Sequence, residues 1–359
     1  MDARRSIGSA DSCPPHLSLG EKRNILQLPG AQVRRTGLET ALGKIIVGQR
    51  SSRIGQPVCA AAGVFLMLAA HSLFAMPSAT PSPQAAAPAT PAVRTMDRAF
   101  VEALAKSDRA AVGMLLDKEF SWTQADGRFL SRSQVDRNLP KPVLGREVDV
   151  ERTERNYGQV EAVHVHTGKR YILRVWVERP EGWRLIVYHE VVQPALATSP
   201  AAVAAGGGSG PATCDNPCKN VPFKPQTEMD DAIIKGWQAQ QTGEWHNDGD
   251  AWGYDIADEF IGVNTGGGQP VTKPTRIAAF KRLKAAGVET SATAPLVSAR
   301  MFDFGETAVM TALHKTGDSY SQISRIWVHR DDHWQMAFSY QTKVEKAAPE
   351  GNKGTSSAR

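Results

Sequence analysis

One ten-residue pattern occurs twice in this chain of 359 residues, as RVWVERPEGW at 174–183 and as RIWVHRDDHW at 325–334. Its arginines and tryptophans recur 325 − 174 = 151 positions later. Two upstream pairs recur at offsets of 140 and 141: Glu119-Phe120 with Glu259-Phe260, and Ser131-Arg132 with Thr272-Lys273. The difference, 151 − 141 = 10, is a loop-sized insertion in the second copy. An order of elements that repeats with such an insertion indicates duplication of a whole domain.

Segments of low complexity separate the two copies from each other and from the N-terminal region. Residues 77–93 are rich in Ala and Pro, and 195–220 hold an Ala/Gly-rich stretch followed by CDNPC. Such segments have little apolar surface to bury and behave as flexible linkers. We therefore predict a first module at 94–194, a second at 221–346 and a loose tail at 347–359.

An export signal is predicted at 56–76. Arg50 and Arg53 precede an apolar run at 58–75, which is followed by small residues and prolines. A positive flank, a short apolar stretch and a small-residue end are typical of a signal peptide. We expect a mature chain that begins near Met76 and is periplasmic or secreted.

A single N-terminal membrane anchor is the alternative. His71 interrupts the apolar run, which leaves it shorter than the ~20 apolar residues that a membrane span needs. The polar residues 1–55 are interpreted as a disordered leader or as the result of a start codon assigned too early.

The formal net charge of +5 belongs to the N-terminal region. Residues 1–55 contain nine Lys/Arg and four Asp/Glu, or 9 − 4 = +5, and the remaining 33 basic and 33 acidic residues cancel. A body without a basic excess lacks the electrostatic footprint of phosphate-backbone binding. We expect no nucleic-acid partner.

Cys214 and Cys218 lie close together in a Pro-containing loop. Export would place them in an oxidising compartment, so we predict a structural disulfide between them. The alternative is half of a metal site, but the second ligand pair at zinc spacing is missing. His164 and His166 share a strand face without an evident third ligand, and we expect no metal site.

Each copy begins with helical patterns. Apolar residues between 100 and 115 recur at helix-like spacings, and Asp108 is placed to cap a second helical piece. In the second copy Ile233 and Trp237 start a similar face, which Gly243 and Gly249 interrupt before Ile256 and Phe260 resume it. Ser131 and Thr272 are the expected caps of a small helix.

Each copy ends with strand patterns. In the first copy these are 160–166, 169–178 and 183–191, joined by hairpin turns at 167–168 and 180–182. Helices first and a meander of strands last predict an α+β fold, with helices packed on a curved, mostly antiparallel sheet.

Three motifs in this order resemble the nuclear-transport-factor-2-like (NTF2-like) superfamily, in particular its SnoaL-like group and the association domain of calcium/calmodulin-dependent kinase. They are Ser107-Asp108…Leu115-Leu116…Phe120, Asp126-Gly127-Arg128 and Arg174…Arg184. The resemblance covers nearly all of 97–191 and, more weakly, 228–342. It implies two tandem cone-shaped modules. This fold serves isomerases, cyclases, dehydratases and pure assembly domains, so it implies no single function.

Strand alternation predicts which side chains line each cone. If Glu178 pairs with Trp183, then Trp176 faces Leu185, Arg174 faces Val187 and Ile172 faces His189. This more apolar face should turn toward the helices. The second module has the matching series Ile323, Arg325, Trp327, Trp334, Met336, Phe338 and Tyr340.

The resemblance implies that Arg174 and Arg325 contact a ligand, because the matching Arg of the kinase association domains points into a pocket that accepts anions. The expected ligand is small and apolar or anionic. The family's second pocket Arg is replaced here by Glu190 or Gln341. The alternative is a structural bridge between Arg174 and an internal acid such as Glu161, since an unpaired buried charge is costly.

The other candidate ligand contacts are Trp122, Trp176, Trp327, His189 and Tyr340. His189 and Tyr340 occupy one equivalent position, where either could donate to a ligand or act in acid–base chemistry. The alternative is that both are satisfied core groups, and that the tryptophans belong to the core.

Two functions remain open. The first is an exported, non-catalytic protein that binds small molecules or serves assembly. The second is a cofactor-independent isomerase, cyclase or dehydratase of the SnoaL-like or steroid-isomerase type, which needs a carboxylate base and an oxyanion donor. Asp258 and Glu259 are candidate acids by location only, and no catalytic residue is assigned. Motifs for cofactor binding are missing from the sequence.

The two modules are expected to pack against each other as an internal copy of the dimer that relatives form from two chains. The face opposite Arg174 and Trp176 is largely apolar, which is typical of an interaction surface. It carries Tyr171, Leu173, Val175, Val177, Ile186 and Tyr188, and in the second module Ile326, Val328 and Ala337. The linker 195–220 has a typical reach of about 25–30 Å, which suits neighbouring domains. Two independent beads are the alternative.

Overall fold

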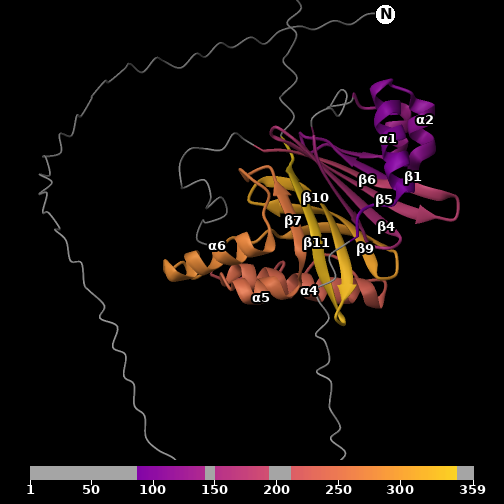
Figure 1. The fold of residues 1–359 in the computed structure, drawn as a ribbon. Helices are drawn as coiled ribbons and strands as arrows, with labels where there is room; N and C mark the ends of the chain where they lie inside the picture. The colour runs from indigo at the N-terminus through magenta and orange to yellow at the C-terminus, as the bar shows by residue number, and fades with distance from the viewer. Residues whose placement is uncertain (1–86, 142–149, 194–211, 346–359) are drawn as a thin grey trace, which may run out of the picture. The chain divides into compact units, whose positions relative to one another are not determined.

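The computed structural model describes residues 87–141, 150–193 and 212–345. The predicted leader and the predicted signal peptide at 56–76 lie outside these residues. The described chain contains two β-sheets, each with its own set of helices (Figure 1). We refer to residues 87–193 as the first half and to 212–345 as the second half.

The first half contains three helices and a six-stranded sheet. The helices are α1 (Pro91–Ala105), α2 (Arg109–Leu115) and α3 (Arg132–Arg137). The strands are β1 (Leu116–Thr123), β2 (Phe129–Ser131), β3 (Glu151–Asn156), β4 (Val160–Thr167), β5 (Arg170–Arg179) and β6 (Gly182–Val192), in the sheet order β2-β1-β6-β5-β4-β3. The three predicted strands correspond to β4, β5 and β6.

The second half repeats this plan. Its helices are α4 (Glu228–Trp245), α5 (Gly249–Tyr254) and α6 (Lys273–Ala285). Its strands are β7 (Ile256–Asn264), β8 (Leu296–Asp303), β9 (Thr307–Thr316), β10 (Ser319–Arg330) and β11 (His333–Lys343), in the order β7-β11-β10-β9-β8. Only the β1–β6 and β7–β11 pairings among the described strands are parallel. The predicted α+β class is confirmed.

The predicted helix caps are present. The Asp108 carboxylate accepts a hydrogen bond from the Ala111 backbone N–H at the start of α2. Ser131 and Thr272 each begin a helix within a capping box. A side-chain oxygen at this position satisfies a backbone N–H that has no partner inside the helix, which is why these residues mark helix starts.

The helical face predicted to resume at Ile256 is wrong, because Ile256 and Phe260 lie in strand β7. Gly243 does not end its helix either, since α4 continues to Trp245. A Cβ on Gly243 would lie 2.7 Å from the Trp252 nitrogen. Gly243 therefore allows α5 to pack closely on α4, and helices α4, α5 and α6 lie side by side (Figure 1).

A β-bulge changes the predicted register of the last strand in both halves. Trp176 pairs with Leu185 as expected, but Arg174 pairs with Tyr188 and Ile172 with Glu190. In the second half Trp327 pairs with Met336, but Arg325 pairs with Ser339. A bulge inserts one residue into one strand, so every later side chain moves to the opposite face.

This register shift moves His189 and Tyr340 away from the helices. Both belong to a region where the two sheets contact each other. His189 is hydrogen-bonded through Nδ1 to Ser324 Oγ at 2.8 Å and through Nε2 to Thr342 Oγ1 at 3.1 Å. Tyr340 is hydrogen-bonded to His164. Burial lowers the pKa of His189 to about 3, so its imidazole is neutral and can both donate and accept.

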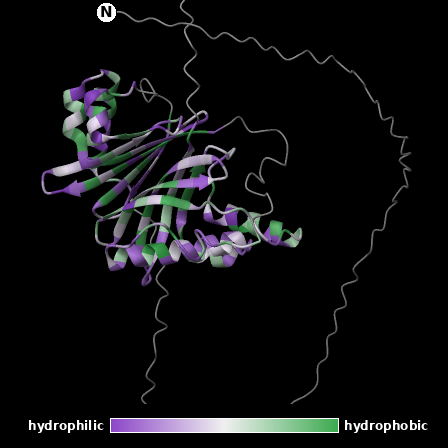
Figure 2. Cartoon of the chain, turned by 180° about the vertical axis from the view of Figure 1, so that it is seen from behind, coloured by the Kyte–Doolittle hydropathy of each residue, from purple (hydrophilic) through white to green (hydrophobic). Residues whose placement is uncertain are grey.

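An apolar cluster surrounds these polar pairs, and it draws residues from both sheets. Most residues of the predicted interaction face belong to it, and the strands carry green, apolar segments between hydrophilic ones (Figure 2). Tyr188 is an exception, because the bulge turns it toward the helices and Val187 takes its place. From the first half the cluster includes Tyr171, Leu173, Val175, Val177, Ile186 and Val187, and from the second Ile326, Val328, Ala337 and Phe338.

A glycine-to-alanine pair tests the contact between the β1–β2 turn and the end of β11. Gly127 has a φ of +79°, and a Cβ there would lie 2.5 Å from Val344 Cα. We expect Gly127→Ala to lower the free energy of unfolding by more than 2 kcal/mol, about 1–3 kcal/mol from the positive φ plus the clash. The matched control is Gly158→Ala, since Gly158 has a φ of +77° and no neighbour within 4 Å. Urea denaturation should show a clearly smaller loss for the control; equal losses would contradict the contact.

Candidate functional site

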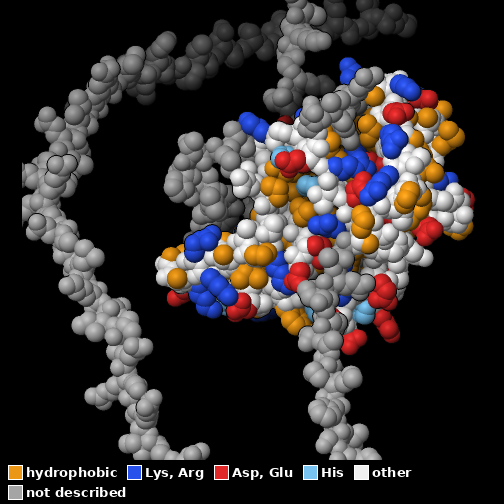
Figure 3. Space-filling view, in the orientation of Figure 1, with side chains coloured by type: hydrophobic (Ala, Val, Ile, Leu, Met, Phe, Trp, Pro, Cys, Tyr) orange, Lys and Arg blue, Asp and Glu red, His pale blue; other side chains and the backbone are white. Residues whose placement is uncertain are grey.

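Charges at the surface occur in pairs, and basic and acidic side chains are interspersed on the face seen in Figure 3. Exposed examples are Arg300 with Glu119 at 2.6 Å and Lys273 with Asp258 at 2.9 Å. Such exposed pairs contribute little to stability. A candidate binding site is therefore sought among the buried charged side chains.

Arg325 of β10 is a buried cation in the second half. Its side chain faces α4, where Arg325 Cζ lies 5.1 Å from the centroid of the Trp237 ring. Nε and Nη1 of Arg325 have no hydrogen-bond partner among the described residues. Burial lowers its pKa to about 10, so the guanidinium is still protonated at neutral pH. A buried charge whose N–H donors make no hydrogen bonds is energetically costly. A hydrogen-bond acceptor at this site would therefore be stabilising.

Glu244 of α4 is the acid that acts on Arg325, and it raises the pKa of that residue. Its carboxylate is already used by two other side chains. Arg276 Nη2 lies 2.5 Å from Glu244 Oε1, and Gln241 Nε2 donates to Oε2 at 3.2 Å. Glu244 is thus the salt-bridge partner of Arg276, and Arg325 makes no salt bridge among the described residues.

Further buried polar atoms on α4, β9 and β10 also lack partners within the described part of the chain. They are Nε1 of Trp237, Nε1 of Trp327, Oε1 of Gln240 and both ring nitrogens of His314. The His314 ring lies 5.4 Å from that of Trp237, and burial with the nearby Arg325 lowers the His314 pKa well below its ordinary value. Buried polar groups are almost always hydrogen-bonded in native proteins. We call Arg325, Trp237, Trp327, Gln240 and His314 the polar cluster.

The first half satisfies the equivalent arginine internally. Arg174 donates through Nε to Asp97 Oδ1 at 2.8 Å and through Nη2 to Oδ2 at 3.0 Å. Trp176 Nε1 and Arg152 Nη1 also donate to Asp97, each at 2.9 Å. Burial opposes the charge of Asp97, but the two arginines outweigh it and its pKa is lowered. The structural bridge considered for Arg174 exists, but with Asp97, because Glu161 instead accepts from Thr90 N and Asn156 Nδ2.

Trp237 occupies the position in the second half that Asp97 occupies in the first. Each lies eleven residues before the aspartate that caps the next helix, Asp108 or Asp248. Both side chains contact the central arginine of their sheet. The acid that neutralises Arg174 is therefore replaced by an aromatic ring that carries no charge.

Large side chains fill the first half where the second has smaller or polar ones. Tyr188 packs on Trp122 with ring centroids 4.1 Å apart and on Phe100 at 5.8 Å. Tyr188 pairs with Trp122 between β6 and β1. In the second half the equivalent pair, between β11 and β7, is Ser339 with Gly262, so neither aromatic ring is present there. Gln240 takes the position of Phe100. Phe260 occupies part of this space, since a Cβ on Gly262 would lie 2.9 Å from its ring.

Glu190 is a buried acid on the helix-facing side of the first sheet. It accepts a hydrogen bond from Trp122 Nε1 at 3.0 Å, and Arg170 Nη1 lies 3.4 Å from its Oε2. Burial raises its pKa to about 7. In the sequence Glu190 stands out only as a departure from the arginine that the resemblance implies, because its burial depends on the bulge in β6.

The substitution Glu190→Gln is expected to stabilise the protein at high pH. Because the pKa of Glu190 is raised in the folded state, its contribution to the free energy of unfolding is fully present below about pH 4.5. That contribution is lost as the pH rises to about 7. The glutamine variant should therefore exceed the wild type by about 1–3 kcal/mol at pH 8 and by little at pH 4.5. Urea unfolding at both pH values measures the difference, with the exposed Glu151→Gln as control. An equal difference at both pH values would contradict the buried, titrating carboxyl.

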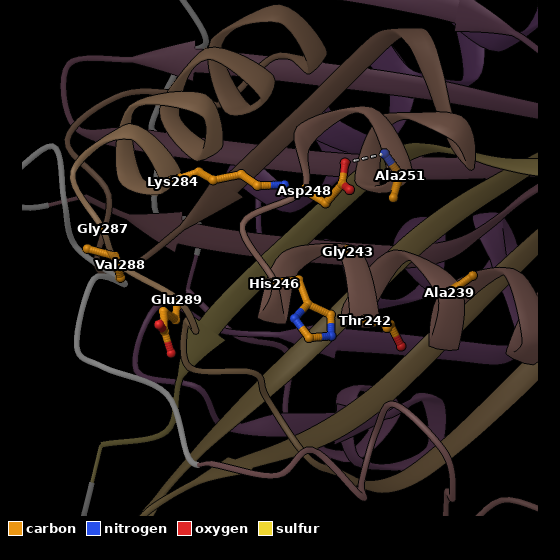
Figure 4. Close-up of a pocket in the computed structure, with 10 residues that line it drawn as sticks. All are labelled: Ala239, Thr242, Gly243, His246, Asp248, Ala251, Lys284, Gly287, Val288 and Glu289. Atoms are coloured by element: carbon orange, nitrogen blue, oxygen red, sulfur yellow. Dashed lines mark hydrogen bonds between the residues drawn. The ribbon is translucent and has the colours of Figure 1, made fainter.

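A surface groove of about 610 Å³ lies where the end of α4, the start of α5 and the end of α6 meet (Figure 4). Small side chains form much of its lining, including Ala239, Gly243 and Ala251. Asp248 at its edge is already used as the cap of α5. Members of the polar cluster do not line this groove, and neither do the other predicted ligand contacts.

The predicted site residues fall into three groups. Arg325 and Trp327 belong to the polar cluster. Arg174, Trp176 and Trp122 face the helices of the first half but have internal partners. His189 and Tyr340 lie between the sheets. An alignment of the helices at an offset of 140 matches Asp97 with Trp237. It would have shown from the sequence that Arg174 has an acid facing it and that Arg325 does not.

The predicted disulfide between Cys214 and Cys218 is present. Asn216 holds this loop against the start of β8, through hydrogen bonds to Leu296 N and Leu296 O. The candidate acids Asp258 and Glu259 are paired with Lys273 and Arg330.

Across 87–141, 150–193 and 212–345, no three His, Cys, Asp or Glu side chains are grouped so that they could hold a metal ion. None of the described helices is both long and apolar enough to span a membrane.

No protein-family model and no curated protein matches this chain. Solved structures are similar over about a third of it. An NTF2-like protein from Cytophaga hutchinsonii is 19% identical, with 32% of this chain and 98% of that chain covered and a TM-score of 0.28. An NTF-2 like protein of unknown function from Silicibacter pomeroyi is 13% identical, with 33% and 99% covered and a TM-score of 0.27. The CaMKII hub of S. rosetta is 18% identical, with 30% and 99% covered and a TM-score of 0.24.

The names of these neighbours are those of the expected fold family, at TM-scores of 0.24 to 0.28. They do not test the tandem arrangement, because each covers only about a third of this chain. At these identities each likeness is one of fold.

Proposed function

We propose that the second half binds a small anionic molecule at Arg325, and that the first half is a filled, structural copy of the same module. The observation that carries this proposal is the contrast between the two arginines. Arg174 has Asp97 as its internal counter-ion, whereas Nε and Nη1 of Arg325 have no partner among the described residues. An anion from outside the chain would supply the missing acceptor.

Physical reasons favour an anion over a neutral ligand. It would neutralise the charge of Arg325, which makes no salt bridge among the described residues, since Glu244 is paired with Arg276. Hydrogen bonds to charged groups are shorter and stronger than neutral ones, and the low dielectric of a buried site strengthens them further. The indole N–H groups of Trp237 and Trp327 are additional donors that have no hydrogen-bond partner among the described residues.

A second candidate function, a cofactor-independent isomerase or dehydratase, rests on Glu190. A carboxyl group with a pKa near 7 is suited to general base or acid catalysis. Its surroundings favour the first proposal, because Trp122 and Tyr188 pack closely together beside it. Loss of any measured isomerase activity in Glu190→Gln would support this second candidate.

Isothermal titration of the full chain with acetate, benzoate, inorganic sulfate and inorganic phosphate tests the binding proposal. At least one anion should bind, and Arg325→Met should weaken it at least tenfold, because a hydrogen bond to a charged group contributes about 1.5–3 kcal/mol. Arg300→Met, at an exposed arginine, is the control and should leave binding unchanged. Equal affinities in the wild type and in Arg325→Met would contradict the proposal.

We also propose that the two halves form an internal counterpart of a dimer. The apolar cluster shared by the sheets and the His189–Ser324 and His164–Tyr340 hydrogen bonds support this. Small-angle scattering and sedimentation of residues 87–346, which keep α1 and its cap whole, are expected to show a compact monomer. An extended two-bead profile, or dimers of each half alone, would count against it.

Export of the mature chain is a further part of the proposal, and it rests on the apolar run at 58–75. The disulfide between Cys214 and Cys218 fits an oxidising compartment. N-terminal sequencing of the protein from its own host is expected to begin near Met76. An unprocessed chain in the cytoplasm would overturn this part.

A further inference from the structure

The first half contains a carboxylate-binding arrangement whose ligand is part of the chain. Two donors converge on one oxygen: Arg174 Nε lies 2.8 Å and Trp176 Nε1 lies 2.9 Å from Asp97 Oδ1. The other oxygen of Asp97 accepts from Arg174 Nη2 at 3.0 Å and from Arg152 Nη1 at 2.9 Å. A fork of parallel N–H groups from arginine matches the two oxygens of a carboxylate.

The second half presents the same two donors without the acceptor. Arg325 and Trp327 lie 151 positions after Arg174 and Trp176 and occupy the same places beside the bulge of their sheet. Nε of Arg325 and Nε1 of Trp327 are both unpartnered within the described residues. These are the two atoms whose counterparts share one oxygen of Asp97.

Trp237 stands where the first half has Asp97, so the second half has no acid at this position but still has the arginine. Arg325 Cζ lies 5.1 Å from the centroid of the indole ring, a cation–π contact. Nε and Nη1 of Arg325 have no hydrogen-bond partner among the described residues, so both remain available to an acceptor. Trp237 Nε1 is one more unpartnered donor in the same cluster.

Building on the proposed function, we propose that the ligand of the second half carries a carboxylate, of which one oxygen is held between Arg325 Nε and Trp327 Nε1, as Asp97 is held in the first half. Trp327 is then a specificity-determining residue. Because Arg325 is a single buried cation without a salt bridge among the described residues, the ligand is a monocarboxylate. Sulfate and phosphate are tetrahedral and do not reproduce the planar pair of oxygens that this donor set holds in the first half.

Isothermal titration of the full chain and of Trp327→Phe with acetate, benzoate and benzamide tests this assignment. Phenylalanine keeps an aromatic ring but lacks the N–H group. Acetate or benzoate should bind the wild type, and Trp327→Phe should weaken that binding about fivefold or more, the effect of one hydrogen bond to a charged group. Benzamide should bind at least tenfold more weakly than benzoate, because it carries no charge to neutralise that of Arg325.

Stability measurements on a matched pair separate this role from a structural one. Both substitutions replace a fully buried indole by a smaller ring, so the cavity that is left lowers the urea midpoint in each. Trp176→Phe also removes a donor that Asp97 uses, whereas the donor that Trp327→Phe removes has no partner among the described residues. Trp176→Phe should therefore lower the midpoint more than Trp327→Phe does, and it should leave carboxylate affinity unchanged.

The outcomes distinguish this inference from the proposed function. If phosphate or sulfate binds more tightly than the carboxylates and Arg325→Met abolishes that binding, the proposed function stands and the carboxylate assignment is wrong. Equal carboxylate affinity in the wild type and in Trp327→Phe also overturns the assignment. If none of the anions binds, both fall.

Discussion

Replacing Asp97 with alanine is expected to lower the free energy of unfolding by about 3–5 kcal/mol, because it leaves the buried Arg174 without its counter-ion. The carboxylate also accepts from Trp176 and Arg152, and these donors would lose their acceptor as well. Urea denaturation measures the loss. Asp258→Ala removes an exposed partner of Lys273 and should cost less than about 1 kcal/mol.

Chemical rescue makes the Asp97 prediction more specific. Formate or acetate can enter the space left by the carboxymethyl group and restore an acceptor for Arg174. Ligand binding to the folded state alone raises stability by RT ln(1 + [L]/Kd). Acetate should therefore raise the urea midpoint of Asp97→Ala more than that of Asp258→Ala. A loss below about 1 kcal/mol in Asp97→Ala would contradict the buried bridge.

Substitution of the two equivalent arginines by methionine should have opposite consequences. Arg174→Met leaves the buried Asp97 with only the partly exposed Arg152 as a cation, so we expect a loss of about 3 kcal/mol or more. Arg325→Met removes a buried charge that lacks an internal counter-ion of its own. It should leave the unfolding free energy unchanged or raise it by about 1–2 kcal/mol.

The same pair of variants separates folding from binding. Arg325→Met should remain folded and lose anion binding, whereas Arg174→Met should lose stability at any anion concentration. Thermal unfolding with and without 10 mM benzoate measures both effects. A large destabilisation by Arg325→Met would mean that this arginine has a structural partner, and it would argue against a ligand site.

Duplication explains how one fold can hold both arrangements. A module that contributes its own carboxylate is closed and stable, and it can act as a scaffold. The other copy is then free to replace the acid, and with Trp237 it keeps the arginine but not the counter-ion. Strongly perturbed buried charges are found preferentially at functional sites, where the cost to folding is balanced by binding.

The local features of this protein follow from its sequence alone. Hydrophobic periodicity, turn residues and cap residues act over a few positions, so the three C-terminal strands of the first copy and the caps at Asp108, Ser131 and Thr272 could be predicted. The pairing of Cys214 with Cys218 is local in the same sense. The α+β class followed from the order of these elements.

Only the tertiary structure decided which of the repeated residues could form a site. One bulged residue in β6 and one in β11 turned His189 and Tyr340 toward the contact between the sheets and brought Glu190 and Ser339 to the helix-facing side. The partner of Arg174 lies 77 positions away on α1, a distance at which no local pattern operates. Arg174 and Arg325 stand in nearly identical sequence motifs. They differ because a separate helix supplies a carboxylate to one and an indole ring to the other, and side chains distant in sequence meet only when the chain has folded.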